Sequence, residues 1–264
     1  MRYKLAQDAR PQASALLLAA ALSLALWFVP YAWVLAYPFK LFVTFIHEGG
    51  HALAALLTGN SVRSLSVAFD TSGLTETLSP QGSYFSQMLI SSAGYLTAIG
   101  FGALLLWLVR RRVKATVVLA GSAVIIAGLT AVFGFLVPLT NLSFSPFTVV
   151  SGAIITAGLL AAARYASRPL ANFLVSFLAV QCVIGALYDL SNLFFISVNT
   201  DAPTDARNMA NIFPIWPLSA PTFWAVFWIA VSLVIMSLAL RCYAVCRTKP
   251  TQQDLPFEDS PLEV

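Results

Sequence analysis

The chain has 264 residues, of which 59% are hydrophobic and 10% are charged, and its formal net charge is +4. Several apolar runs reach the length of about 20 residues that crosses a bilayer, which excludes a soluble globular protein. No basic stripe with interleaved aromatic residues is present, which excludes a nucleic-acid partner. The three cysteines have no CxxC spacing and predict no disulfide framework. We therefore expect one integral, multi-pass membrane domain.

The N-terminal apolar segment has two possible interpretations. Residues 1–12 are polar, and the segment from Ala13 to Val29 is rich in Ala and Leu. Such a segment is typical of a signal peptide or of a first membrane helix. The chain continues apolar from Trp27 to Trp33 and offers no clear small-residue cleavage site. We therefore favour a retained first helix, with a signal peptide as the alternative.

The second apolar segment, from about Pro38 to Leu57, contains the sequence His47-Glu-Gly-Gly-His51. Residues four apart share a helical face, so His47 and His51 can bind one ion, as in the HExxH motif of zinc metalloproteases. Glu48 then lies beside that ion, where its carboxylate can take a proton from a zinc-bound water. The chain has only these two histidines, and an ionisable residue at bilayer depth indicates a functional site. We predict a Zn²⁺ site here; a metal-free polar network is the alternative.

Residues 61–80 differ from the apolar segments around them in their pattern of apolar and polar residues. Apolar and polar side chains alternate on both sides of the sequence Asp70-Thr-Ser-Gly73. A period of two around a glycine-containing turn predicts a short β-hairpin. A hairpin beside a protease site can offer its edge to an extended substrate, whereas the alternative is an ordinary connecting loop.

The rest of the chain predicts an all-α polytopic membrane protein with about six to seven transmembrane helices in total. We expect three regions: a polar N-terminal segment (1–12), a single membrane metalloprotease domain (13–246) and a disordered acidic tail (247–264). The five helices expected after the hairpin lie at about Tyr84–Val109, Ala115–Val137, Phe147–Ala163, Pro169–Ile196 and Pro221–Leu240.

The distribution of basic residues supports two opposite membrane orientations. Five Lys and Arg residues lie at the N-terminus and in the loops 58–83, 138–146 and 197–220, and the other ten lie on the opposite side. On this count the positive-inside rule places the C-terminus in the cytoplasm. The basic N-terminus favours the opposite orientation, so both orientations stay as alternatives.

A third metal ligand is needed, because a catalytic zinc generally has three protein ligands and no further histidine exists. Asp189 is the acid that lies within a predicted span, where a carboxylate needs a strong partner such as a divalent cation. Asp205 is the competitor, because its segment can fold back into the bundle, although it is also an N-cap candidate before Ala206. We predict Asp189 as the ligand, with Asp205 as the alternative third ligand. Asn192, one turn after Asp189, is expected to orient that carboxylate or to bind substrate.

The segment from His47 to Gly59 resembles the signature helix of the site-2 protease family, the intramembrane zinc metalloproteases. It is most similar to a compact peptidase branch with an HEGGHALAALLTG-type signature. The sequence Ser92-Ala-Gly94 and a late helix containing an Asp also fit this branch. The chain departs from better-known members, in which an Asp-Gly follows an Asn-Pro-like element, because Leu190 follows Asp189.

The resemblance implies that His47 and His51 bind zinc, that Glu48 is the general base and that an Asp on a later helix is the third ligand. It also implies an intramembrane zinc metalloprotease that hydrolyses peptide bonds in or near transmembrane segments of membrane-protein substrates. A catalytically inactive zinc-binding scaffold, or pseudoprotease, is the first alternative. An ion- or proton-coupled transporter is the second, but the sequence shows no inverted repeat of the HExxH helix.

Overall fold

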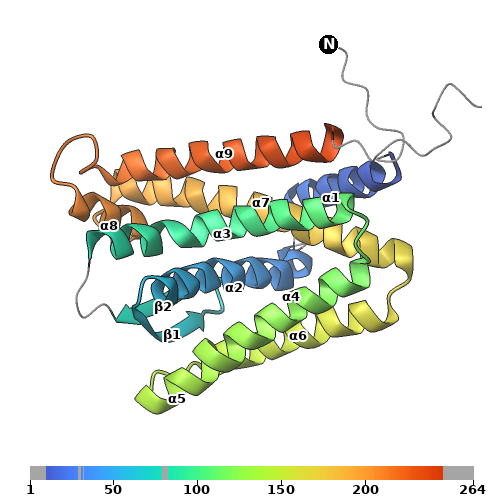
Figure 1. The fold of residues 1–264 in the computed structure, drawn as a ribbon, viewed down its shortest axis with the longest axis horizontal. Coiled ribbons are helices and arrows are strands. Elements are labelled where there is room, and N and C mark those ends of the chain that lie inside the picture. Colours follow the sequence, from blue (N-terminus) through green and yellow to red (C-terminus); the bar gives the residue numbers. More distant parts are fainter. Residues whose placement is uncertain (1–9, 29–30, 32, 79–82, 246–264) are drawn as a thin grey trace, which may run out of the picture.

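The structure is a computed structural model that describes residues 10–28, 31, 33–78 and 83–245, so the predicted tail lies outside the described residues. Within these ranges the chain is mostly helical, with one small sheet (Figure 1). In chain order the elements are α1 (Arg10–Phe28), α2 (Trp33–Leu57), β1 (Ser61–Val67), β2 (Gly73–Leu78), α3 (Tyr84–Arg110), α4 (Ala115–Leu129), the π-helical segment η2 (Thr130–Leu136), α5 (Val137–Asn141), α6 (Pro146–Tyr165), α7 (Arg168–Asn199), α8 (Asp205–Ile212) and α9 (Pro221–Val245).

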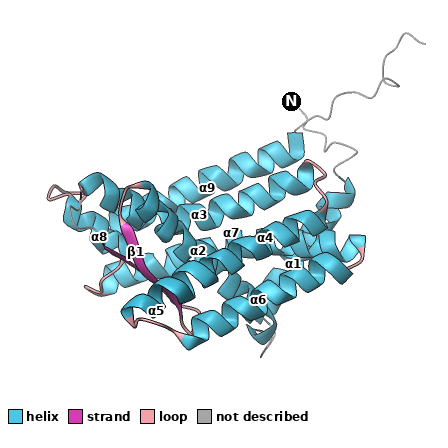
Figure 2. Ribbon diagram, turned by 60° about the horizontal axis from the view of Figure 1, so that its bottom comes forward, coloured by secondary structure: helices cyan, strands magenta, loops and turns pink. Residues whose placement is uncertain are grey.

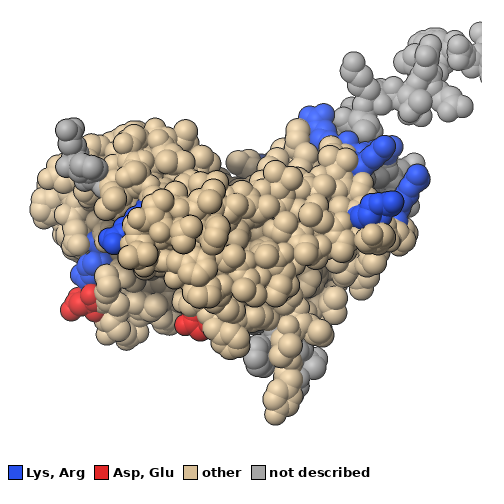
Figure 3. All heavy atoms as spheres, turned by 90° about the horizontal axis from the view of Figure 1, so that it is seen from below, with Lys and Arg blue, Asp and Glu red and all other residues tan. Residues whose placement is uncertain are grey.

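Within the described residues, five helical stretches are long and apolar enough to cross a membrane: α3, the stretch Ala115–Asn141, α6, α7 and α9. Large apolar side chains on their outer faces are exposed, among them Val124 at 69% and Ile154 at 65%. Figure 3 shows Lys and Arg gathered toward the right of one face, a smaller number of charged side chains in its left half, and uncharged side chains over most of the rest. Such a surface fits contact with lipid. The protein is an integral multi-pass membrane protein, as predicted.

Helix α2 lies in the middle of the bundle. Figure 1 shows α3, α7 and α9 side by side on one side of α2, and α4 paired with α6 on the other. The largest apolar cluster includes Phe42 and Phe45 of α2, Ile99 of α3, Leu119 of α4 and Val175 of α7. Burial of these side chains fixes α2 between the two groups of helices. Helix α2, which contains the HExxH motif, therefore packs against other helices on several of its faces.

The predicted hairpin is confirmed. Strands β1 and β2 are antiparallel and pair from Ser61 with Leu78 to Val67 with Gly73. In the turn, the backbone N–H and the hydroxyl of Ser72 both donate to Asp70, over 3.0 and 2.6 Å. These hydrogen bonds lower the pKa of Asp70. Period-two alternation and local turn chemistry thus predicted the place and the turn of this element.

Strand β1 is also tied to the helices behind it. The hydroxyl of Thr148 in α6 lies 2.8 Å from the backbone nitrogen of Val67 and 3.2 Å from its carbonyl oxygen. The side-chain amide of Asn141 in α5 donates to the carbonyl of Arg63 over 2.9 Å. Figure 2 shows β1 running past α5. Side chains of the bundle thus form hydrogen bonds with backbone groups of β1.

Two helices extend past a proline at which a boundary was expected. Helix α2 begins at Trp33, so Pro38 lies inside it. The helix after α3 also continues beyond the expected end at Val137. The π-helical segment η2 precedes Pro138, and this proline lies in the first turn of α5, where its missing N–H is tolerated.

Helix α8 forms within the polar segment 197–220, where Asp205 was considered as the N-cap of a short helix. Its N-cap is Thr204, whose hydroxyl accepts a hydrogen bond from the backbone N–H of Arg207 over 3.2 Å. Asp205 is therefore the first helical residue and not the cap. The buried residues Ala206, Met209 and Ala210 occupy one helical face. They join the apolar cluster that contains Trp224 and Trp228 of α9, and this burial holds α8 against the bundle.

Candidate metal centre

The two histidines of α2 point toward one small space. Their Nε2 atoms lie 3.1 Å apart. Nδ1 of His51 lies 2.6 Å from the carbonyl oxygen of Ile90 in α3. A carbonyl only accepts hydrogen bonds, so Nδ1 carries the proton and Nε2 of His51 presents a lone pair. Helix α3 therefore fixes both the orientation and the tautomer of this ring.

Asp205 supplies a carboxylate to the same space from α8. Its Oδ2 atom lies 3.5 Å from Nε2 of His51. One ligand atom from each of His47, His51 and Asp205 lies within 4.8 Å of the other two. The pKa of Asp205 is raised, because burial raises it by more than the neighbouring His51 lowers it. Among the described residues, this is the group of three that can hold a metal ion, and Asp189 is not part of it.

The residues present fit a divalent metal ion. Two imidazole nitrogens and one carboxylate oxygen form a donor set that zinc accepts in catalytic sites. A cation between them would satisfy the lone pair of His51 and the charge of Asp205 together. Space for this is kept by Gly94 of α3, because a Cβ atom there would lie 2.4 Å from Nε2 of both histidines. The backbone of α3 therefore borders the centre directly.

The carboxylate of Glu48 is positioned by strand β2. The hydroxyl of Thr75 lies 2.7 Å from Oε2 of Glu48, to which it donates, and 3.0 Å from the carbonyl oxygen of the same residue. The backbone at Gly73 comes so close that a Cβ atom there would lie 2.5 Å from Oε1. Glu48 is 5% exposed. The hairpin thus covers the carboxylate and sets its orientation.

A cavity of about 680 Å³ opens beside these groups. It is bordered by α2, the hairpin turn, β2, α3, α7 and α8. All the polar residues selected from the sequence therefore surround one space. Those that line it are His47, Glu48, His51, Asp189, Asn192 and Asp205.

The family described as Peptidase M50B-like matches residues 16–239, which is most of the chain. The chain belongs to this family. The predicted resemblance to the site-2 protease family is thereby confirmed, and the protein is a site-2 protease-like membrane metallopeptidase by family. No curated protein and no solved structure matches the chain.

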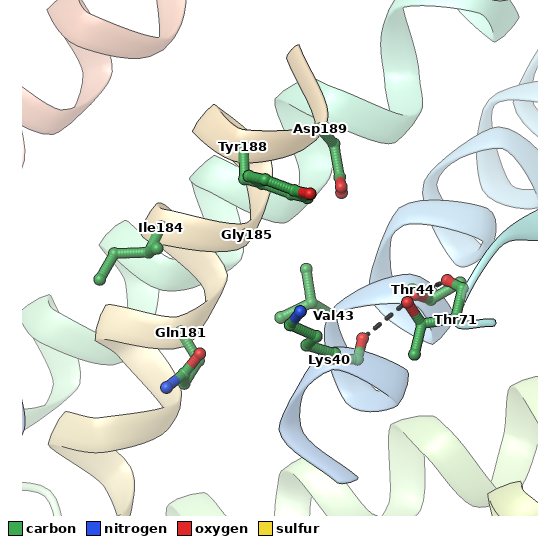
Figure 4. A pocket seen from close by; sticks show the side chains of 9 residues that line it. All are labelled: Lys40, Val43, Thr44, Thr71, Gln181, Ile184, Gly185, Tyr188 and Asp189. Atoms are coloured by element: carbon green, nitrogen blue, oxygen red, sulfur yellow. Dashed lines mark hydrogen bonds between the residues drawn. The ribbon is translucent and has the colours of Figure 1, made fainter. Parts of the chain in front are cut away.

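In this M50B-like protein, Asp189 and Asn192 line the large cavity from α7, but Asp189 lies apart from the histidine group. Figure 4 shows its carboxylate directed from α7 toward α2, across a smaller cavity of about 60 Å³. Lys40 lines the same cavity and lies 5.7 Å from the ring centroid of Tyr188. The hydroxyl of Thr44 donates to the carbonyl of Thr71 over 2.8 Å at its border (Figure 4).

Sequence reasoning missed three contributors to the site. Thr75 gave no signal, because a threonine in an alternating strand is ordinary. The ring of Tyr95 packs edge-on against His47 at 4.6 Å and stacks on Trp228 at 5.3 Å, and nothing in the local pattern indicates this. The carbonyl of Ile90 is a backbone group and carries no sequence signal. Gly94 was recognised only as part of a small-residue stretch that allows close helix approach.

Replacing Gly94 with Ala is expected to abolish metal binding, because the added methyl group would occupy the space in front of both Nε2 atoms. The matched control is Gly100→Ala in the same helix, where an added Cβ meets nothing within 4 Å. Zinc content would be measured by elemental analysis on monodisperse protein. A Gly94→Ala protein that holds as much zinc as the Gly100→Ala protein would contradict the assignment of α3 as the wall of the centre.

Proposed function

We propose that this M50B-like protein is a zinc-dependent peptidase that hydrolyses peptide bonds in or near transmembrane segments of other membrane proteins. The supporting observation is the convergence of His47, His51 and Asp205, whose ligand atoms lie within 4.8 Å of one another. The buried Glu48 is the next residue to His47 and lines the same cavity. In this proposal His47, His51 and Asp205 hold the zinc, so Asp205 replaces Asp189 as third ligand.

The residues of the chain divide the chemistry between them. Zinc, when bound, polarises the scissile carbonyl and lowers the pKa of a water molecule to about 7. Glu48 takes a proton from the attacking water and delivers it to the nitrogen of the leaving amine. Thr75 donates to Oε2 of Glu48 and so fixes the orientation of the carboxylate that handles this proton. The hydrogen bond from His51 to Ile90 keeps Nε2 of the ring directed at the metal.

In this proposal the hairpin binds the substrate in an extended conformation. Gly73, Leu74 and Thr75 of β2 line the cavity beside Glu48. Strand β1 pairs with β2 and is also bonded by Thr148 and Asn141, so β2 is the strand with an edge to offer. A substrate helix must unwind before its peptide bonds can be attacked, and pairing with a strand edge stabilises the extended form. We therefore assign β2 as the strand that aligns the substrate backbone.

The test combines metal content with turnover. Purified protein is expected to contain about one zinc ion per chain and to cleave members of a panel of transmembrane substrates. His51→Ala is expected to lose both, because it removes a ligand at the centre of the group. Zinc-loaded wild-type protein that binds substrate helices without cutting any of them would support the inactive scaffold instead.

A further inference from the structure

Asp189 is a carboxylate on the wall of the large cavity that the proposed chemistry does not use. It projects from α7 and lines both the cavity of about 680 Å³ and the smaller one of about 60 Å³. Figure 4 shows its side chain directed from α7 into the space in front of α2. Asp189 therefore faces the same interior space as the HExxH motif, although it lies apart from the histidine group.

The carboxylate of Asp189 has no direct partner within the part of the chain that the structure describes. No hydrogen bond and no ion pair shorter than 4.0 Å joins its oxygen atoms to another described residue. Neighbouring polar groups are bonded elsewhere: the hydroxyl of Thr44 donates to the carbonyl of Thr71, and the side-chain amide of Gln181 donates to Ser23. A carboxylate among membrane helices usually has a cationic or hydrogen-bonding partner. The oxygen atoms of Asp189 are therefore available to a ligand.

Lys40 is the basic residue that lines the smaller cavity with Asp189. It is exposed, and its ammonium group lies 5.7 Å from the ring centroid of Tyr188. It attracts the carboxylate through space, but its nitrogen stays more than 4.0 Å from the oxygen atoms of Asp189. Lys40 therefore competes with a cationic ligand for Asp189 without occupying its place.

The large cavity is negatively charged. Glu48, Asp189 and Asp205 line it, and none of its lining residues is a Lys or an Arg. A divalent metal ion between the histidines and Asp205 balances two of these three negative charges. The charge that remains after metal binding favours a cationic substrate group over a neutral or anionic one.

Asn192 adds a second acceptor next to Asp189. It lies one turn further along α7 and lines the same cavity, and residues three apart share a helical face. Its side chain forms no hydrogen bond with the described residues. Lys and Arg side chains carry only donors, so a carboxylate and an amide oxygen side by side match them. This face of α7 therefore suits an ammonium or guanidinium group.

We propose that Asp189, with Asn192 beside it, is a specificity-determining residue that binds a Lys or Arg side chain of the substrate near the scissile bond. This assignment rests on the proposed peptidase function, because Asp189 and Glu48 line one cavity. Lys and Arg are frequent at the ends of transmembrane segments and rare in their apolar middle. The substrate class is therefore a transmembrane segment that is cut close to a basic end.

The test compares synthetic transmembrane peptides that carry Lys, Arg, norleucine or Glu at successive positions along one end. Cleavage is measured with wild-type protein in neutral-lipid nanodiscs, and binding is measured with the zinc-loaded Glu48→Gln protein, so that recognition is observed without turnover. At the best position, Lys and Arg are expected to improve binding and cleavage by about 10–100-fold over norleucine, the range of a hydrogen bond to a charged group. Glu is expected to be the poorest.

The variants assign this preference to one carboxylate. Asp189→Asn keeps the size of the side chain and is expected to bring the ratio of Lys to norleucine peptides to about one, whereas Asp189→Glu is expected to keep a preference for Lys. The matched control is Asp201→Asn, the same change at an exposed carboxylate outside the cavity, and it is expected to keep the full ratio. Lys40→Gln removes the competing cation and is expected to raise the ratio about two- to fivefold.

Each outcome decides the proposal. A preference for Lys that is lost in Asp189→Asn, at wild-type zinc content and with a monodisperse elution profile, supports it. Equal binding of the Lys and norleucine peptides by wild-type protein, or a preference that survives in Asp189→Asn, would overturn it. Loss of zinc in Asp189→Asn would assign the carboxylate to the metal centre and also overturn it.

Two further results keep the test decisive. If Asp189→Asn is not monodisperse, Lys40→Gln decides: a raised ratio supports the proposal, and an unchanged ratio overturns it. A preference for Lys in binding that depends on Asp189, without cleavage of any peptide by wild-type protein, would support recognition by Asp189 and refute the proposed peptidase function.

Discussion

Glu48→Gln is expected to slow peptide hydrolysis by about 10²–10⁴-fold, the range that general acid–base catalysis contributes. Glutamine has nearly the same size and keeps an acceptor for the hydroxyl of Thr75, but it cannot carry the proton from water to the leaving amine. The metal ligands are untouched, so zinc is expected to stay at about one ion per chain. Single-turnover cleavage and zinc content would be measured on the same preparation.

The control for this substitution is Glu258→Gln, which makes the same chemical change in the C-terminal segment outside the described residues. It is expected to leave both cleavage and zinc content at wild-type values. Cleavage by the Glu48→Gln protein at the wild-type rate would refute the assignment of Glu48 as general base. Loss of zinc together with cleavage would instead show that Glu48 supports the metal centre.

Asp205→Ala is expected to remove nearly all bound zinc, whereas Asp189→Ala is expected to retain it. Oδ2 of Asp205 lies 3.5 Å from Nε2 of His51, while Asp189 faces Lys40 across the smaller cavity. Loss of a direct ligand is expected to weaken zinc binding by more than the 10–100-fold that is typical for residues behind the ligands. Zinc affinity would be measured by competition with a chelator of known affinity.

Asp201→Ala is the matched control, because Asp201 lies in the segment before α8 and its fully exposed carboxylate pairs with Arg207. It is expected to retain zinc. The opposite pattern, with zinc lost in Asp189→Ala and kept in Asp205→Ala, would restore Asp189 as the third ligand. Reduced turnover of Asp189→Ala at full zinc content would instead indicate a role of its carboxylate in the cavity beside the substrate.

The sequence by itself determined the features that depend on neighbours along the chain. The spacing of His47 and His51 places both rings on one helical face, and alternation around Gly73 forms a hairpin. Both follow from backbone geometry over a few residues. The apolar runs likewise predicted membrane helices, because the length of a span follows from the thickness of the bilayer.

Which carboxylate lies beside the two histidines, and how Glu48 is oriented, depend on tertiary structure. The sequence favoured Asp189 because it lies in an apolar span, but the direction of a side chain around α7 depends on which helices pack against it. Asp205 reaches the histidines because Met209 and its buried neighbours dock α8 against Trp228 of α9. Thr75 meets Glu48 only after the hairpin has folded back on α2. Local periodicity determines which face of an element is apolar, whereas the contacts between elements that complete the centre depend on how those faces pack together.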